Sequence, residues 1–145
     1  MNNHLEYDPG VLPPSPAPSA GDEVAFKLEG MPPYKDEHFS IRNPRHKIHG
    51  RFVALRKMAI DAMAGRARYS EAVSLNFDMH APEFERGRSL LDYVSGIMDT
   101  LDGSHGVNFT YLPIVYEDDC QVAAGRQRFV KGEATWYEIK ILFLG

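Results

Sequence analysis

Three consecutive acidic residues, Glu117, Asp118 and Asp119, follow a segment rich in strand-forming residues, 113–116. Carboxylates are poor strand formers, and adjacent like charges repel one another. A basic residue or a divalent cation is the counter-charge that relieves such repulsion. Magnesium takes oxygen ligands, usually one or two carboxylates together with water and substrate phosphates. The acidic run is therefore a candidate for part of a metal site.

A second acidic group lies on a predicted helix, residues 89–103, with Ser89 as the expected N-cap and Gly103 as the C-terminal stop. Polar residues spaced by 3, 4 and 3 share one face of such a helix. These residues are Asp92, Ser95, Asp99 and Asp102. No Lys or Arg interleaves with them, so pairing along the helix does not relieve their charge.

Geometry limits which acids can share an ion. Asp92 and Asp99 are two helical turns apart, about 10 Å along the axis, which is too far for joint chelation. Asp118 and Asp119 would point to opposite faces of a regular strand. Because a helix and the strand that follows it usually pack together, the simplest site combines one helix acid with one strand acid.

The distribution of charge predicts a basic surface, although the net charge is −4. Residues 35–68 contain nine Lys or Arg and three acids, whereas residues 83–119 contain eight acids and two arginines. DNA affinity comes mainly from neutralisation of phosphates, and a carboxylate-bound cation beside a basic surface suits phosphoryl transfer. The predicted DNA-binding residues in the basic region are Lys35, Arg42, Arg45, Lys47 and Arg51.

The elements that must position these residues follow from the period of the apolar residues. In chain order we expect strand 24–30, helix 51–65, strand 71–80, helix 89–103, strand 113–125, a strand end and hairpin turn over 126–133, and strand 134–145. This β–α–β–α–β–β order predicts a single α+β domain with two helices and a small mixed or antiparallel sheet.

Two segments outside these elements have distinct compositions. Residues 31–50 contain three prolines and many charges, which predicts a long exposed loop, and such loops tend to be functional. Residues 1–23 hold five of the ten prolines and four acids without Lys or Arg. We therefore expect a disordered, Pro-rich acidic tail, followed by one domain over 24–145.

The composition also argues against several classes of protein. The single cysteine, Cys120, excludes an internal disulfide framework and a multi-cysteine metal site, and it favours a reducing cytoplasmic setting. No apolar run approaches the ~18–20 residues of a membrane span. The N-terminus lacks the basic and apolar regions of a secretory signal. We expect a cytoplasmic protein without a membrane segment.

Two motifs resemble those of the RusA-like family of Holliday-junction endonucleases. The family pattern is roughly Asp-x-Asp-Asn, a Lys three residues later, then Asp-x-Leu-x-Gly and, after a loop, Asp-Asp-x-Gln. The sequence "DTLDG" at 99–103 matches the third part, and "DDCQ" at 118–121 matches the last. The resemblance extends over 24–145 and is most specific over 92–122.

The first family motif differs in this chain. The two early family aspartates fall on Ser89 and Leu91, the Asn falls on Asp92, and the Lys falls on Ser95. Asp119 keeps its family position, and we expect Asp92 to substitute for the missing aspartates. The resemblance thus implies Asp92, Asp99 and Asp119 as catalytic residues and Asp92, Asp118 and Asp119 as metal ligands. The missing Lys would be replaced by one of three further DNA-binding residues: Arg86, Arg88 and Lys131.

The resemblance implies a function as well as a fold. It implies a Mg²⁺-dependent endonuclease that acts as a homodimer and resolves four-way DNA junctions during recombination or repair. The altered first motif leaves an alternative open, in which a RusA-like domain binds branched DNA or a protein partner without cutting. The apolar C-terminal strand is a candidate for the dimer interface.

Overall fold

The computed structural model describes residues 16–102 and 111–145. It contains β1 (Glu23–Glu29), α1 (His49–Met63), β2 (Val73–Ala81), α2 (Leu90–Leu101), the 3₁₀ turn η1 (Asp119–Gln121), β3 (Val122–Ala124), β4 (Gln127–Lys131) and β5 (Trp136–Phe143). These elements confirm the predicted α+β class with two helices and a mixed sheet. The first fifteen residues of the predicted tail and most of the loop after α2 lie outside the described residues.

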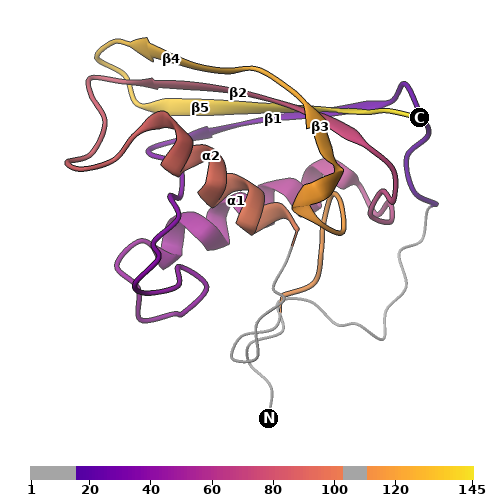
Figure 1. Cartoon of the computed structure of the whole chain (residues 1–145), viewed down its shortest axis with the longest axis horizontal. Coiled ribbons are helices and arrows are strands. Elements are labelled where there is room, and N and C mark those ends of the chain that lie inside the picture. The colour runs from indigo at the N-terminus through magenta and orange to yellow at the C-terminus, as the bar shows by residue number, and fades with distance from the viewer. Residues whose placement is uncertain (1–15, 103–110) are drawn as a thin grey trace.

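The sheet is built around β2. Strand β5 pairs antiparallel with β2 on one side and with β1 beyond it, while β3 and β4 pair parallel with β2 on its other side. Every second residue of β2 is buried, because Val73, Leu75, Phe77 and Met79 face the helices. Both helices cover the same face of the sheet (Figure 1).

The predicted hairpin near the C-terminus is not formed. Strands β4 and β5 lie on opposite sides of β2, so the connection between them passes the end of β2. The backbone N–H of Gly132 donates to the oxygen of Ala81 at this end. The sequence predicts strand 134–145, but residues 127–131, predicted within a strand end and hairpin turn, form a separate strand on the other side of β2.

The predicted strand over 113–125 is mostly absent. Only Val122–Ala124 forms a strand, apart from an isolated parallel bridge between Tyr116 and Tyr69, and the acidic run leads into η1. Asp118 caps this turn, since its Oδ1 accepts a hydrogen bond from the backbone N–H of Cys120 (3.1 Å). Short polar side chains compete with strand pairing in this way, so the repelling acids are accommodated in a turn instead of a strand.

Residues 31–50, predicted as an exposed loop, are instead partly packed into the core. Tyr34, Ile41, His46 and Ile48 are buried, while most of the charged side chains between them face solvent. None of the helices within residues 16–102 and 111–145 is both long and apolar enough to cross a membrane.

Gly96 lies where α2 meets this loop most closely. A Cβ atom at this position would lie 2.5 Å from the backbone oxygen of Pro33 and 2.6 Å from the Cα of Tyr34. We therefore expect Gly96→Ala to lower the free energy of unfolding by about 2 kcal/mol, because overpacking forces backbone shifts. Urea unfolding followed by circular dichroism measures this change.

Gly50 in α1 is the matched control, because a Cβ there would meet nothing within 4 Å. Gly50→Ala is expected to stabilise the protein by up to about 1 kcal/mol, since alanine is the better helix former. Equal effects of the two substitutions would contradict the close packing of α2 on the loop.

Candidate metal centre

Three carboxylates meet where α2 ends and η1 begins. Asp99 and Asp102 are three residues apart and share one face of the last turn of α2, and Asp119 is the first residue of η1. One carboxylate oxygen of each lies within 4.8 Å of the others. Asp102 is only 3% exposed. Within the described part of the chain, Asp119 Oδ1 is buried without a hydrogen-bond partner.

The end of α2 is held by groups from other segments. Arg42 Nη2 donates to the backbone oxygen of Asp99 (2.9 Å), and Arg56 Nη1 donates to that of Thr100 (2.7 Å). The N–H of Ile114 donates to the oxygen of Leu101 (3.1 Å). These bonds satisfy carbonyls that a helix end otherwise leaves without partners. They also fix the backbone from which two of the three acids project.

Electrostatics at this helix end disfavour three negative charges. The helix C-terminus carries a partial negative charge, and its last turn contains no basic residue. Burial and the neighbouring carboxyl group of Asp119, together with the charge of Asp99, raise the pKa of Asp102 to about 9, while Arg42 acts in the opposite direction. Burial raises the pKa of the Tyr116 hydroxyl well above its ordinary value, and the three carboxylates add to this rise. A cation bound among the acids would remove this cost.

The geometry fits a hard divalent cation. Oxygen ligands of an octahedral magnesium ion at about 2.1 Å lie about 3.0 to 4.2 Å from one another, and the three carboxylates are already within a similar separation. Asp99, Asp102 and Asp119 would supply protein ligands and leave other positions for water and phosphate oxygens. Such an ion stabilises charge on a phosphate and lowers the pKa of bound water.

Gln121 holds the turn that carries Asp119. Its Oε1 accepts hydrogen bonds from the backbone N–H groups of Glu117 (2.7 Å) and Asp118 (2.9 Å). Its Nε2 donates to the backbone oxygens of Tyr69 (2.9 Å) and Glu71 (2.8 Å). One amide therefore ties η1 to the segment before β2.

We expect Gln121→Ala to weaken Mg²⁺ binding about tenfold or more, a size typical of residues that orient metal ligands. The four lost hydrogen bonds release the turn, so the Asp119 carboxylate is no longer held beside α2. Titration calorimetry with Mg²⁺ measures the affinity. Arg126→Ala is a control, because this exposed residue follows β3 and forms its hydrogen bonds to Asn76 and Phe77 through its backbone. If Gln121→Ala and Arg126→Ala bound Mg²⁺ with the same affinity, the hydrogen bonds of Gln121 would have no role in metal binding.

The structure brings Asp99 and Asp119 together, as the sequence suggested, but adds Asp102 in place of Asp92. Asp92 lies at the beginning of α2, where its Oδ2 accepts a hydrogen bond from the N–H of Ser89 (2.8 Å) in a capping box. Seven residues of helix, about 10 Å, separate it from Asp99. The Asp118 carboxylate caps η1 and is also outside the group of three.

The predicted basic residues lie in different places. Arg42 is at the acidic group, with its Nη2 3.8 Å from Asp102 Oδ1. Lys131 pairs with Ala81 at the end of β2, whereas β3, which follows η1, pairs at the beginning of β2. Arg86 and Arg88 precede α2, so a full helix length lies between them and Asp99. Arg42, rather than these three, is the basic side chain beside the acids.

The other predicted DNA-binding residues differ in whether their charged groups already contact another side chain. Arg51 forms a two-point ion pair with Glu85, with distances of 2.7 and 2.8 Å. The Arg88 guanidinium lies 3.7 Å from the centre of the Tyr34 ring. The exposed members of the set are Lys35, Arg45, Lys47, Arg86 and Lys131.

Sequence reasoning missed two residues of this centre. Asp102 lies on the predicted acidic face, and its three-residue spacing from Asp99 is the signal that identifies it, because residues three apart on a helix are neighbours. Arg56 is completely buried in α1 and also donates to the oxygen of Leu112. An arginine within a helical pattern carries no signal that it is buried.

Comparison with models of known protein families finds no match, and comparison with curated proteins finds none either.

Proposed function

We propose that this protein is a Mg²⁺-dependent endonuclease that cuts DNA phosphodiester bonds, with four-way junctions as its substrate. The observation that carries the proposal is the convergence of Asp99, Asp102 and Asp119 from two elements. A domain without a cation gains no stability from such a group, because burial of mutually repelling carboxylates is costly.

In this proposal, different residues of the chain have different roles at the metal centre. The three carboxylates hold the cation, and Gln121 keeps the turn of Asp119 in place. Arg42 adds a guanidinium at the same edge, where it can donate to a phosphate oxygen. The bound Mg²⁺ supplies charge stabilisation on the phosphate and activates water for hydrolysis.

The exposed basic residues near Arg42 support a DNA partner. Lys35, Arg45 and Lys47 belong to the same loop region and face solvent. Phosphate neutralisation by such residues gives DNA binding that weakens as salt rises. We propose that this loop binds the DNA backbone beside the metal centre.

The choice of branched DNA rests on the resemblance to RusA-like endonucleases. The motif "DDCQ" supports this resemblance in a physical way, because each of its matching residues has a distinct role. Asp118 caps the turn, Asp119 belongs to the acidic group, and Gln121 clamps the turn. We propose that the protein works as a homodimer in recombination or repair, since a four-way junction offers two symmetric strands.

A cleavage assay on a synthetic four-way junction tests this function. With the full chain we expect paired nicks near the branch point in Mg²⁺, none in EDTA, and far fewer on a linear duplex of the same sequence. Gel-shift measurement in EDTA reports binding separately. Intact junction binding without any nick at enzyme excess in Mg²⁺ would overturn the nuclease assignment and favour the non-cleaving alternative.

A further inference from the structure

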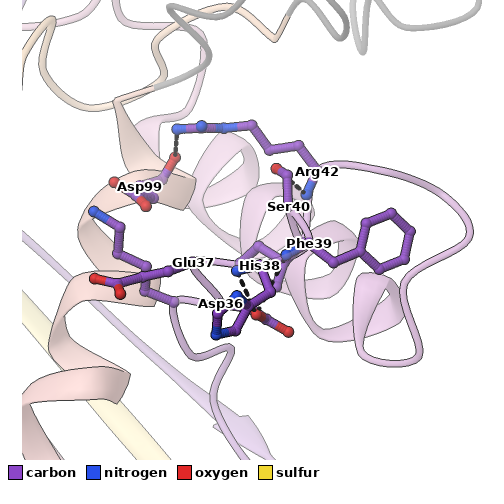
Figure 2. A pocket seen from close by; sticks show the side chains of 9 residues that line it. Asp36, Glu37, His38, Phe39, Ser40, Arg42 and Asp99 are labelled. Carbon is purple, nitrogen blue, oxygen red and sulfur yellow. Dashed lines mark hydrogen bonds between the residues drawn. The ribbon is translucent and has the colours of Figure 1, made fainter.

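A pocket lies directly beside the acidic group. It is formed by residues 35–42 and by Asp99 of α2, and its volume is about 250 Å³. Figure 2 shows Arg42 reaching from the loop toward α2, where it donates to the backbone oxygen of Asp99. Since Asp99 belongs both to this pocket and to the group of three acids, a ligand in the pocket would lie against the cation site.

The groups lining the pocket combine several kinds of chemistry. Lys35 and Arg42 supply positive charge, Ser40 supplies a hydroxyl group, and Ile41 supplies apolar surface. Three carboxylates also line the pocket: Asp36 pairs with His46, Asp99 belongs to the cation site, and Glu37 can accept hydrogen bonds from a base. Guanidinium and ammonium groups bind phosphate oxygens. Ligand pockets typically pair apolar walls with a few polar groups that fix orientation. A nucleotide has the matching parts: an anionic phosphate, a polar sugar and a flat base with a polar edge.

The size of the pocket restricts its occupant. Its volume is slightly below the ~300–1,000 Å³ of most small-molecule sites. A B-form duplex, whose major groove alone is about 12 Å wide, cannot enter it. A single nucleotide can enter once it leaves the stack, and this costs least where base pairing is already interrupted.

The loop that forms the pocket is held in place. His46 is buried, and its Nδ1 accepts a hydrogen bond from the N–H of Ile48 (3.1 Å), so its Nε2 donates to Asp36 Oδ2 (2.9 Å). Asp36 Oδ1 also accepts bonds from the N–H groups of His38 (3.0 Å) and Phe39 (3.3 Å). The Phe39 ring stacks on His46. The pocket is therefore preformed, as ligand sites usually are.

We propose that this pocket binds one unstacked nucleotide of the DNA strand that is cut, next to the phosphate at the metal centre. The position beside the cut phosphate rests on the proposed nuclease function, whereas binding of a nucleotide rests on the pocket alone. The pocket would make cleavage depend on an intact base beside the cut.

Nucleotide binding is tested with deoxynucleoside 5′-monophosphates added to the full chain in Mg²⁺, followed by NMR chemical shifts. We expect shifts at residues 35–42 and Asp99, and weaker shifts with inorganic phosphate at the same concentration. Lys35→Ala should weaken nucleotide binding about fivefold. Lys57→Ala is the control, because Lys57 is exposed on α1 outside the pocket. Three results would each overturn nucleotide binding by this pocket. They are no shift at 35–42, equal binding of inorganic phosphate, and no effect of Lys35→Ala.

A junction assay distinguishes two errors: a wrong assignment of nucleotide binding to the pocket, and a wrong assignment of nuclease activity to the protein. Junctions with an abasic site on one side or the other of the cut should be cleaved at least about fivefold more slowly at one of these positions. Normal cleavage of both abasic junctions would overturn the pocket and leave the nuclease intact. Monophosphate binding at 35–42 by a protein that cuts no junction would overturn the nuclease and leave the pocket intact.

Discussion

Asp119→Asn is expected to lower Mg²⁺-dependent junction cleavage about a thousandfold while leaving junction binding unchanged or tighter. The substitution keeps the shape of the side chain but removes a charged metal ligand and one repulsive charge near the DNA. The turn should survive, because the bonds that hold it come from Asp118 and Gln121. Single-turnover cleavage and gel shift on the same junction measure the two effects.

Asp118→Asn is the matched control, since it removes the same charge one residue away. Asparagine caps a turn about as well as aspartate, so η1 should remain folded. We expect its cleavage rate to stay within about threefold of the parent. Equal loss of activity in both variants would contradict the geometry, in which Asp119 is a metal ligand and Asp118 is not.

Asp102→Asn is expected to stabilise the protein in the absence of metal, by about 1 to 3 kcal/mol at pH 8. This carboxyl group is buried beside Asp99 and Asp119, so a neutral amide removes both the cost of burial and the repulsion. The same substitution should abolish stabilisation by Mg²⁺. Thermal unfolding in EDTA and in Mg²⁺ measures both changes.

The effect of Asp102→Asn on the stability of the metal-free protein depends on pH in a defined direction. The pKa of Asp102 is about 9 in the folded protein without metal, against about 3.9 in an unfolded chain. The folded state therefore binds more protons between these values, and stability falls as pH rises from about 4 to about 9. Mg²⁺ binding displaces this proton, so stabilisation by Mg²⁺ should grow with pH over the same range.

Asp61→Asn is the control for removal of a charge, because Asp61 is exposed on α1. In EDTA the parent and Asp61→Asn should lose stability between pH 5 and pH 8.5 more steeply than Asp102→Asn. Parallel curves for all three proteins would show that Asp102 is not the group that binds a proton in the folded state over this pH range.

Apolar periodicity was sufficient to predict most elements. Helix 89–103 and strand 71–80 correspond closely to α2 and β2, because each buries one regular face against the core. In the predicted helix 51–65 and strand 134–145, Phe52 and Tyr137 are buried, and Trp136 is half-buried. These features depend on local pattern, which the sequence carries directly.

The features that were missed depend on contacts between distant segments. The acidic run reads as a strand end, but caps from Asp118 and Gln121 turn it into a 3₁₀ turn. The position of the metal centre depends on which end of α2 meets that turn. Arg42 and Arg56 come from other segments to hold this end. None of these contacts leaves a periodic signal in the chain.

Diffraction from crystals of the protein soaked in Mn²⁺, measured at a wavelength where manganese scatters anomalously, tests the central claim most directly. Manganese replaces magnesium at oxygen sites. We predict one anomalous peak with oxygens of Asp99, Asp102 and Asp119 at about 2.1 to 2.3 Å. A peak bound instead by Asp92 or Asp118, or no peak among the three acids at a saturating Mn²⁺ concentration, would contradict the metal centre described above.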